Sequence, residues 1–137
     1  MKGKAENFGQ KVGEVVYQAM ADAINVPVKD YFQIITDYDS HTLIYDPTYL
    51  DIQRTPGVIV IQITLNEGLT VELKKLLYQT IAERLHRGLD VRREDVFISL
   101  VEVKKKIGLL GMALRSMHHI KLINWEDLCL ICLQAPT

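Results

Sequence analysis

One side chain of this chain stands out as a candidate for binding chemistry. Arg54 lies near the end of a long polar connection, residues 37–57, that also holds three tyrosines and two prolines. A connection of about 20 residues in a compact domain is usually functional or carries local structure of its own. A guanidinium group there could bind an anionic molecule, although a surface ion pair is the simpler explanation.

Other reactive residues occur in pairs that suit no obvious chemistry. Cys129 and Cys132 have the spacing of a redox or metal-binding pair, but one pair cannot complete a tetrahedral zinc site. His118 and His119 are adjacent, so their side chains diverge in a helix or a strand. We therefore predict no metal site and no cofactor.

The elements that position these residues occur twice. When the chain is shifted by 65 residues, Val16 falls on Ile81 and Phe32 falls on Phe97 without a gap. Such a repeat indicates duplication of a supersecondary unit. The second copy opens with an apolar strand, residues 58–65, whose counterpart would precede Met1. We expect the first copy to lack its opening strand.

Apolar periodicity then gives the fold class. Asn7, followed by Gln10, is a suitable start for the first helix, and Thr70 can cap the second. The apolar run at 58–65 is typical of a central strand. The predicted architecture is a two-layer α/β sandwich from a duplicated β-α-β unit with its first strand absent. The expected elements are helices at 7–24 and 70–87 and strands at 31–36, 58–65 and 96–103.

Length and charge exclude several classes of function. The chain has 137 residues, which suits one domain, and a formal net charge of −1 with acidic and basic residues interspersed. This balance argues against nucleic acid or anionic membranes as partners. No apolar stretch approaches the roughly 20 residues of a membrane span, and the start lacks a signal segment. We expect a cytoplasmic protein.

Residues 1–105 resemble the tautomerase superfamily, in particular its longer-chain branch, which includes the malonate semialdehyde decarboxylases. The stretches that carry the resemblance are VPVKDYFQIIT at 26–36, LIYDPTYLDIQR at 43–54, VIVIQITLNEGLTVELKKLLYQTIAERL at 58–85 and VRREDVFISLVEV at 91–103. The resemblance implies paired β-α-β units, a homotrimer, and active sites near subunit boundaries. It also implies keto-enol tautomerisation of small 2-oxo acids or related carbonyl compounds.

In this family the base is the amino group of a proline that opens the first strand. The corresponding position would precede Met1, so we assign no catalytic residue and expect this chain to be impaired. Lys2 follows Met1 on an expected turn and is no substitute. A free α-amino group has a pKa of about 8 and can act as a neutral base near pH 7.

Two further positions bear on the chemistry that the resemblance implies. Asp30 matches the acidic residue that the decarboxylases use beside the proline, so Asp30 and Arg54 are the substrate-binding candidates. Asp30 has a repeat counterpart, Asp95, so a turn carboxylate explains it equally well. Glu67 and Leu69 stand where the decarboxylase branch has arginines, which disfavours a decarboxylase or hydratase but leaves it as the alternative.

Residues 106–137 form a tail outside the resemblance. Codons compatible with KIGLLGMALRSM at 106–117, read from the third base of the lysine codon, give NWSFGNGIAQY, which resembles the family's continuation. We therefore predict an out-of-frame tail, and a non-catalytic gene remnant is a further alternative. The apolar run Leu128–Leu133 could form a stray helix or promote aggregation. The tail could also cover the backbone of 58–65 that a missing strand would leave unpaired.

Overall fold

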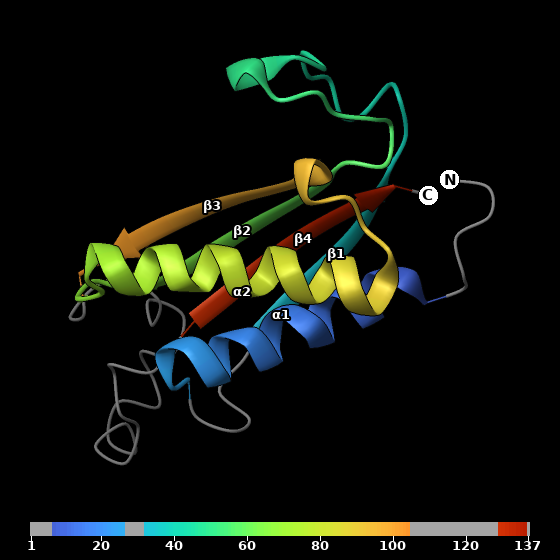
Figure 1. Cartoon of the computed structure of the whole chain (residues 1–137). Coiled ribbons are helices and arrows are strands. Elements are labelled where there is room, and N and C mark those ends of the chain that lie inside the picture. Colours follow the sequence, from blue (N-terminus) through green and yellow to red (C-terminus); the bar gives the residue numbers. More distant parts are fainter. Residues whose placement is uncertain (1–6, 27–31, 105–128, 137) are drawn as a thin grey trace.

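The protein is a two-layer α/β structure, described by a computed structural model for residues 7–26, 32–104 and 129–136. Two helices lie side by side on one face of a four-stranded sheet (Figure 1). Among the described residues no strand precedes the first helix. The elements in chain order are α1 (Phe8–Ile24), β1 (Phe32–Tyr38), β2 (Ile59–Asn66), α2 (Val71–Leu89), β3 (Val96–Val103) and β4 (Cys129–Pro136), with short 3-10 turns at Tyr49–Asp51 and Arg93–Asp95.

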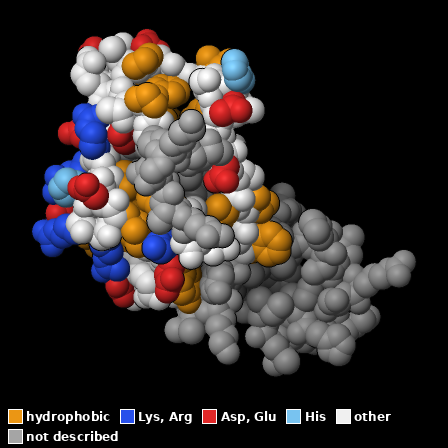
Figure 2. Space-filling model, turned by 90° about the vertical axis from the view of Figure 1, so that its right-hand side faces the viewer, with side chains coloured by type: hydrophobic (Ala, Val, Ile, Leu, Met, Phe, Trp, Pro, Cys, Tyr) orange, Lys and Arg blue, Asp and Glu red, His pale blue; other side chains and the backbone are white. Residues whose placement is uncertain are grey.

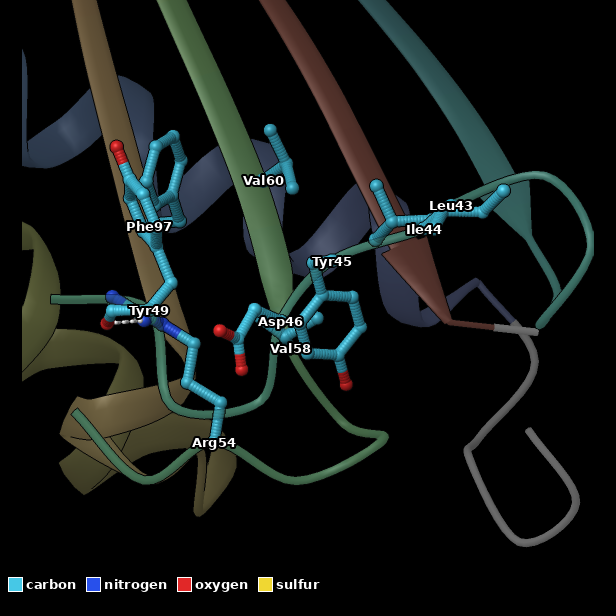
Figure 3. Close-up of a pocket in the computed structure, with 9 residues that line it drawn as sticks. All are labelled: Leu43, Ile44, Tyr45, Asp46, Tyr49, Arg54, Val58, Val60 and Phe97. Carbon is cyan, nitrogen blue, oxygen red and sulfur yellow. Dashed lines mark hydrogen bonds between the residues drawn. The ribbon is translucent and has the colours of Figure 1, made fainter. Parts of the chain in front are cut away.

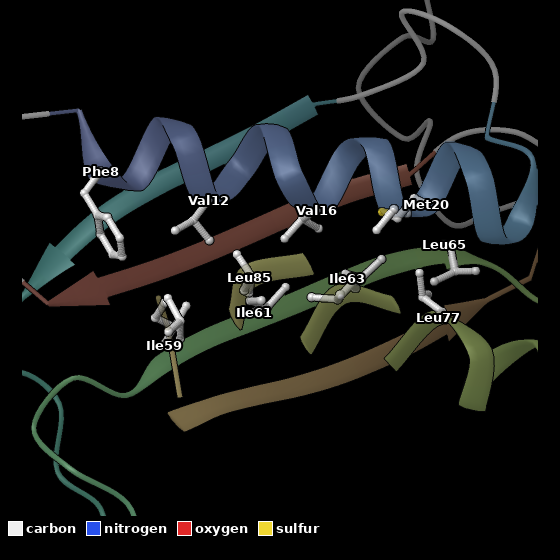
Figure 4. Packing of buried hydrophobic residues seen from close by; sticks show 13 residues of the cluster. Phe8, Val12, Val16, Met20, Ile59, Ile61, Ile63, Leu65, Leu77 and Leu85 are labelled. Atoms are coloured by element: carbon white, nitrogen blue, oxygen red, sulfur yellow. The ribbon is translucent and has the colours of Figure 1, made fainter. Parts of the chain in front are cut away.

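The core lies between the helices and the sheet. Alternate residues of β2, among them Ile61 and Ile63, are fully buried against both helices (Figure 4). Val16 of α1 and Ile81 of α2, which the 65-residue repeat superposes, are both fully buried. Gly13 lets α1 approach β1 closely, because a Cβ there would lie 2.6 Å from the Gln33 side-chain oxygen. The Gln33 side-chain amide donates a hydrogen bond of 2.8 Å to the Gly13 carbonyl. The apolar stripes of the sequence therefore define the interior.

The sheet has the strand order β1-β4-β2-β3. β2 pairs in parallel with β3, from Ile59 opposite Val96 to Asn66 opposite Val103. β4 lies between β1 and β2, parallel to the first and antiparallel to the second. β2 is thus a central strand, as the sequence predicts, but β4 comes from the tail.

Four expectations about element ends and positions have clear outcomes. Thr70 caps α2, since its hydroxyl accepts a hydrogen bond of 3.2 Å from the amide of Leu73. The capping box expected at Asn7 is wrong, because Asn7 has a left-handed backbone with φ of 61° and makes no side-chain cap bond. The strand expected at 96–103 is confirmed as β3, but the expectation that it is buried is wrong, because β3 is a half-buried edge strand. The stray helix within Leu128–Leu133 is also wrong, because from Cys129 onward this run is the strand β4.

Among the described residues, the sheet face away from the helices is covered only at one end, by the connection between β1 and β2. β1 directs Gln33 and Ile35 toward α1 and therefore presents Phe32 and Ile34 on the other side, where they are 65% and 45% exposed. Val101 of β3 is also exposed. We call this surface the open face.

Charged side chains of both signs alternate over the helix side of the molecule instead of forming a patch of one sign (Figure 2). Several of them pair, for example Arg84 of α2 with Asp22 of α1 at 2.7 Å. Exposed pairs of this kind contribute little to stability. No helix in the described part of the chain is long and apolar enough to cross a membrane.

Candidate functional site

A pocket of about 370 Å³ opens where the polar connection folds over the open face of the sheet (Figure 3). Its floor is apolar and comes from the first residues of β2 and β3. Its wall comes from the connection, which contributes two tyrosines, one carboxylate and one guanidinium. The lining residues are Leu43, Ile44, Tyr45, Asp46, Tyr49, Arg54, Val58, Val60 and Phe97. Pockets of this size, with few polar groups on an apolar surface, suit small molecules.

The end of the connection is tied down by a buried carboxylate. Asp95, only 3% exposed, accepts hydrogen bonds from the Thr55 amide at 2.8 Å and the Thr55 hydroxyl at 2.5 Å. The Tyr45 hydroxyl donates to the carbonyl of Thr55 at 2.8 Å. Arg92 lies 3.5 Å from the Asp95 carboxylate and supplies the opposite charge. These contacts fix Thr55 and hold the neighbouring Arg54 beside the start of β2.

Arg54 has a cationic side chain with unused hydrogen-bonding capacity. Its Nη1 donates to the carbonyl of Tyr49 at 2.7 Å, and its guanidinium carbon lies 5.8 Å from the centre of the Phe97 ring. Its Nε is buried and has no hydrogen-bond partner among the described residues. None of the ion pairs in this part of the chain involves Arg54, so the surface ion pair considered from sequence is not formed there. A buried donor on a cation without an acidic partner favours an anionic ligand.

Asp46 is the negative charge of the pocket. The backbone amide of Thr48 donates to its carboxylate at 2.9 Å and the Thr48 hydroxyl donates at 2.8 Å, which together lower the pKa of Asp46. The carboxylate is solvent-exposed, and none of the ion pairs among the described residues joins it to Arg54.

Tyr38, at the end of β1, joins that strand to the start of β2. Its hydroxyl donates to the carbonyl of Val58, and the residue is buried. Burial, followed by the charges of Tyr45 and Asp95, raises the pKa of Tyr38 well above its ordinary value. The protonated phenol is therefore the form that the fold stabilises.

Stability should fall as the pH rises above about 10, where an unfolded tyrosine ionises while folded Tyr38 keeps its proton. Because the folded pKa is the raised one, the contribution is complete below that pH and is lost as the pH climbs toward the folded pKa. We expect Tyr38 to add up to about 1.4 kcal/mol per pH unit to the slope. Urea unfolding between neutral pH and pH 11 would measure it, and equal slopes for the protein and Tyr38→Phe would contradict it.

The structure separates the residues singled out from sequence. Arg54, with Tyr45 and Tyr49, lines the pocket at the start of β2. Asp30 lies outside the described residues, as do His118 and His119. Its repeat counterpart Asp95 has the structural role just described. Cys129 and Cys132 lie in the central strand β4.

The sequence reasoning missed Phe97 as part of this pocket. Its neighbours Val96 and Ile98 pack against the core, so Phe97 faces the opposite side of β3. The Tyr49 ring lies 6.3 Å from the Phe97 ring and extends the apolar surface. Phe97 is the repeat counterpart of Phe32. This match within the sequence could have indicated that both rings lie on the same face of the sheet.

The pocket and the start of β4 lie at opposite ends of the sheet. β4 runs antiparallel to β2, and its first residue, Cys129, is opposite Leu65 near the end of β2. Arg54 precedes the start of β2. Val58, which lines the pocket, lies seven residues before Leu65, and seven steps of about 3.3 Å along a strand span about 23 Å. Within one subunit, the Arg54 guanidinium and the first residue of the central strand β4 therefore cannot contact one small molecule.

Comparison with known proteins gives a consistent set of relatives. Residues 30–106 match a family model described as tautomerase enzyme. The chain is 47% identical over 98 residues to the probable tautomerase YusQ of Bacillus subtilis (strain 168), covering 72% of this chain and 77% of that protein. It is 26% identical over 102 residues to the probable tautomerase YrdN of the same organism, covering 74% and 78% of the two chains.

Solved structures extend the likeness to the fold. A malonate semialdehyde decarboxylase, described with a structural basis for decarboxylase and hydratase activities, superposes with a TM-score of 0.74 at 20% identity, over 90% of this chain and 95% of that chain. A second malonate semialdehyde decarboxylase, inhibited by 3-bromopropiolate, superposes with a TM-score of 0.70 at 26% identity, over 87% and 92%. The likeness covers more than the 98 aligned residues of YusQ.

Proposed function

This chain belongs to the tautomerase enzyme family, and from that premise we propose that it binds small 2-oxo acids or related carbonyl compounds in the Arg54 pocket. The family supplies the substrate class, because the relatives are probable tautomerases. The pocket supplies a place for a molecule with an anionic end and an apolar body. Its size suits a small carboxylic acid better than a polymer.

The observation that carries this proposal is that the Arg54 guanidinium has no acidic partner among the described residues. A substrate carboxylate beside it would supply the missing negative charge and gain a charge-assisted hydrogen bond. The Phe97 ring and the floor valines would contact the remainder of the molecule. Both Tyr45 and Tyr49 lie within the wall, where a hydroxyl or a ring can contact a carbonyl group.

We further propose that turnover by this chain is weak. By resemblance, the family base is an amino-terminal proline that opens a strand in the middle of the sheet. In this chain β4 takes a place in the middle of the sheet, and its first residue, Cys129, is joined to Leu128 by a peptide bond. An amide nitrogen carries no basic lone pair, so it cannot replace a free amine.

A decarboxylase or hydratase is the second candidate, favoured by the superposition on two malonate semialdehyde decarboxylases. The turn after β2 argues against it. Glu67 and Leu69 occupy that turn, where the resemblance to the decarboxylase branch calls for arginines. An acidic and an apolar side chain there would not stabilise a second anionic group.

The open face supports a proposal of self-assembly. Phe32, Ile34 and Val101 present apolar surface that a second subunit could cover, and a homotrimer is the assembly that the resemblance implies. The Arg54 pocket and the start of β4 are far apart in one subunit. For both to contact one substrate, the pocket of one subunit would have to lie beside the start of β4 of a neighbouring subunit. Sedimentation of a monomer would refute assembly. We also propose a cytoplasmic location, where small carbonyl acids are available.

An assay that separates binding from turnover tests the proposed function. An aromatic 2-oxo acid whose enol absorbs in the ultraviolet would be added, and both its enol decay and its binding heat would be measured. We expect saturable binding with enol decay close to the buffer rate. YusQ serves as the matched control, because it is a close relative described as a probable tautomerase.

Each result of this assay has a distinct meaning. Enol decay well above the buffer rate would refute weak turnover. Absence of saturable binding would refute the role of the pocket. Release of carbon dioxide from a 3-oxo acid would favour the decarboxylase.

A further inference from the structure

The two strands β1 and β2 do not pair with each other, and the space between them is filled by β4 (Figure 1). β4 pairs with seven residues of β1 and with six of β2. Within the described part of the chain, β4 is the only strand that pairs with β1. β1 therefore depends on the tail segment to belong to the sheet.

The register of β4 follows the internal repeat. Adding 65 to Phe32 gives Phe97, and Phe97 pairs with Val60 while Phe32 pairs with Leu130. Both parallel pairs keep this register to their ends, where Tyr38 is opposite Pro136 and its repeat counterpart Val103 is opposite Asn66. Leu130–Pro136 thus pairs with β1 in the same register in which Val60–Asn66 pairs with β3.

The antiparallel pairing of β4 with β2 is compatible with this equivalence. Gln62 is opposite Cys132, and these two positions correspond to each other under the equivalence of Val60 with Leu130. On either side of this pair the contacts exchange: Ile61 is opposite Leu133, and Ile63 is opposite Ile131. An approximate two-fold axis therefore passes through the pair formed by Gln62 and Cys132.

We infer that β1 and β2 form a strand-binding slot, and that the chain's own Cys129–Pro136 fills it in the position that the 65-residue repeat assigns to the opening strand of its first copy. Strand pairing uses backbone amides and carbonyls, which any non-proline sequence supplies, so a segment outside the repeat can take this place. Both slot walls would otherwise expose a row of unpaired donors and acceptors. This inference does not depend on the proposed function.

A disulfide across the two-fold axis tests both the slot and its register. Gln62 is exposed, so Gln62→Cys should fold, and it would lie opposite the native Cys132. Opposed residues of antiparallel strands have Cα atoms about 4.5–5.5 Å apart, within the range that a disulfide spans. We expect mild oxidation to link residues 62 and 132 within one chain, detected as a linked peptide pair that reduction separates.

Ser99→Cys is the matched control. Ser99 is the neighbour of Gln62 on the other side, in β3, so β2 separates it from β4. Two strand spacings place its Cα about 9.6 Å from that of Cys132, which is too far for a disulfide. It should stay unlinked under the same oxidation.

Four results would overturn the inference. They are no link in Gln62→Cys, a link to Cys129 in place of Cys132, a link between chains, or equal linking in Ser99→Cys. A second measurement needs no variant. Amides of Cys129–Ala135 should exchange with solvent as slowly as those of Ile59–Asn66, and fast exchange confined to the tail strand would also refute its place in the slot.

Discussion

Replacing Cys132 with proline is expected to lower the free energy of unfolding substantially. Cys132 lies in the middle of β4, opposite Ile34 on one side and Gln62 on the other. Proline has no amide hydrogen and is excluded from the middle of a sheet, and leaving the carbonyl that faces it without a donor costs about 1–3 kcal/mol. Domains of this size have a free energy of unfolding of about 5–15 kcal/mol, so this loss is a large fraction of the total. Urea unfolding followed by circular dichroism would measure it.

Cys132→Val is the control for this substitution. Valine keeps the amide hydrogen and favours strands, so it should fold with an unfolding midpoint close to that of the unchanged protein. A proline variant with the same midpoint as the valine variant would show that β4 contributes nothing to the stability of the sheet. The comparison isolates the backbone of one residue from its side chain.

Removing the guanidinium of Arg54 is expected to have the largest effect on ligand binding. In Arg54→Ala the affinity for a small 2-oxo acid should fall by roughly 10-fold to 150-fold, which corresponds to about 1.5–3 kcal/mol for a hydrogen bond to a charged group. Arg54→Lys keeps the charge but loses the planar guanidinium, so its affinity should lie between that of the unchanged protein and that of Arg54→Ala. Titration calorimetry with the same acid would give all three values.

Arg87→Ala controls for the loss of a positive charge. Arg87 is an exposed residue of α2 that pairs with Glu83 at 2.8 Å and takes no part in the pocket. Its replacement changes the net charge equally but should leave the affinity unchanged. If both alanine variants weaken binding to the same extent, long-range charge and not a site at Arg54 attracts the acid.

The repeat made most of the fold predictable from sequence. Apolar spacing placed both helices and three of the four strands within about two residues of their ends, and β3 at its observed bounds. The signal was strong because each element buries one face, which fixes the period of its apolar residues. Asn7 failed as a cap because the helix-start pattern specifies residue types and not the backbone conformation that precedes the helix.

The place of β4 was not predictable from its own residues. An apolar run of six to eight residues can be a strand or part of a helix, and periodicity alone does not distinguish them. Its strand form follows from the unpaired walls of β1 and β2, which are remote in sequence. The frameshift predicted for the tail remains a prediction. Strand pairing does not contradict it, because the slot binds backbone amides and carbonyls, which do not depend on the side chains.

The candidate site was predictable only as a list of residue types. Arg54 was identified by its place in a long connection, but its lack of an acidic partner depends on how that connection folds. The bonds from Thr55 to Asp95, 40 residues away, decide this geometry. No local pattern encodes a contact of that range, so the choice between ligand and ion pair needed the structure.

β4 finishes at the end of the sheet where α1 begins, and α1 leads back to β1 (Figure 1). In space, the order β4, α1, β1, β2, α2, β3 is therefore a complete doubled β-α-β unit, and the chain is its circular permutation. A permuted chain with its ends opened before Cys129 would keep every strand pair. It would also place a free amino group, with a pKa of about 8, at the first residue of the central strand. The connectivity of the chain, more than the arrangement of its strands, thus determines whether this end of the sheet carries a basic amine.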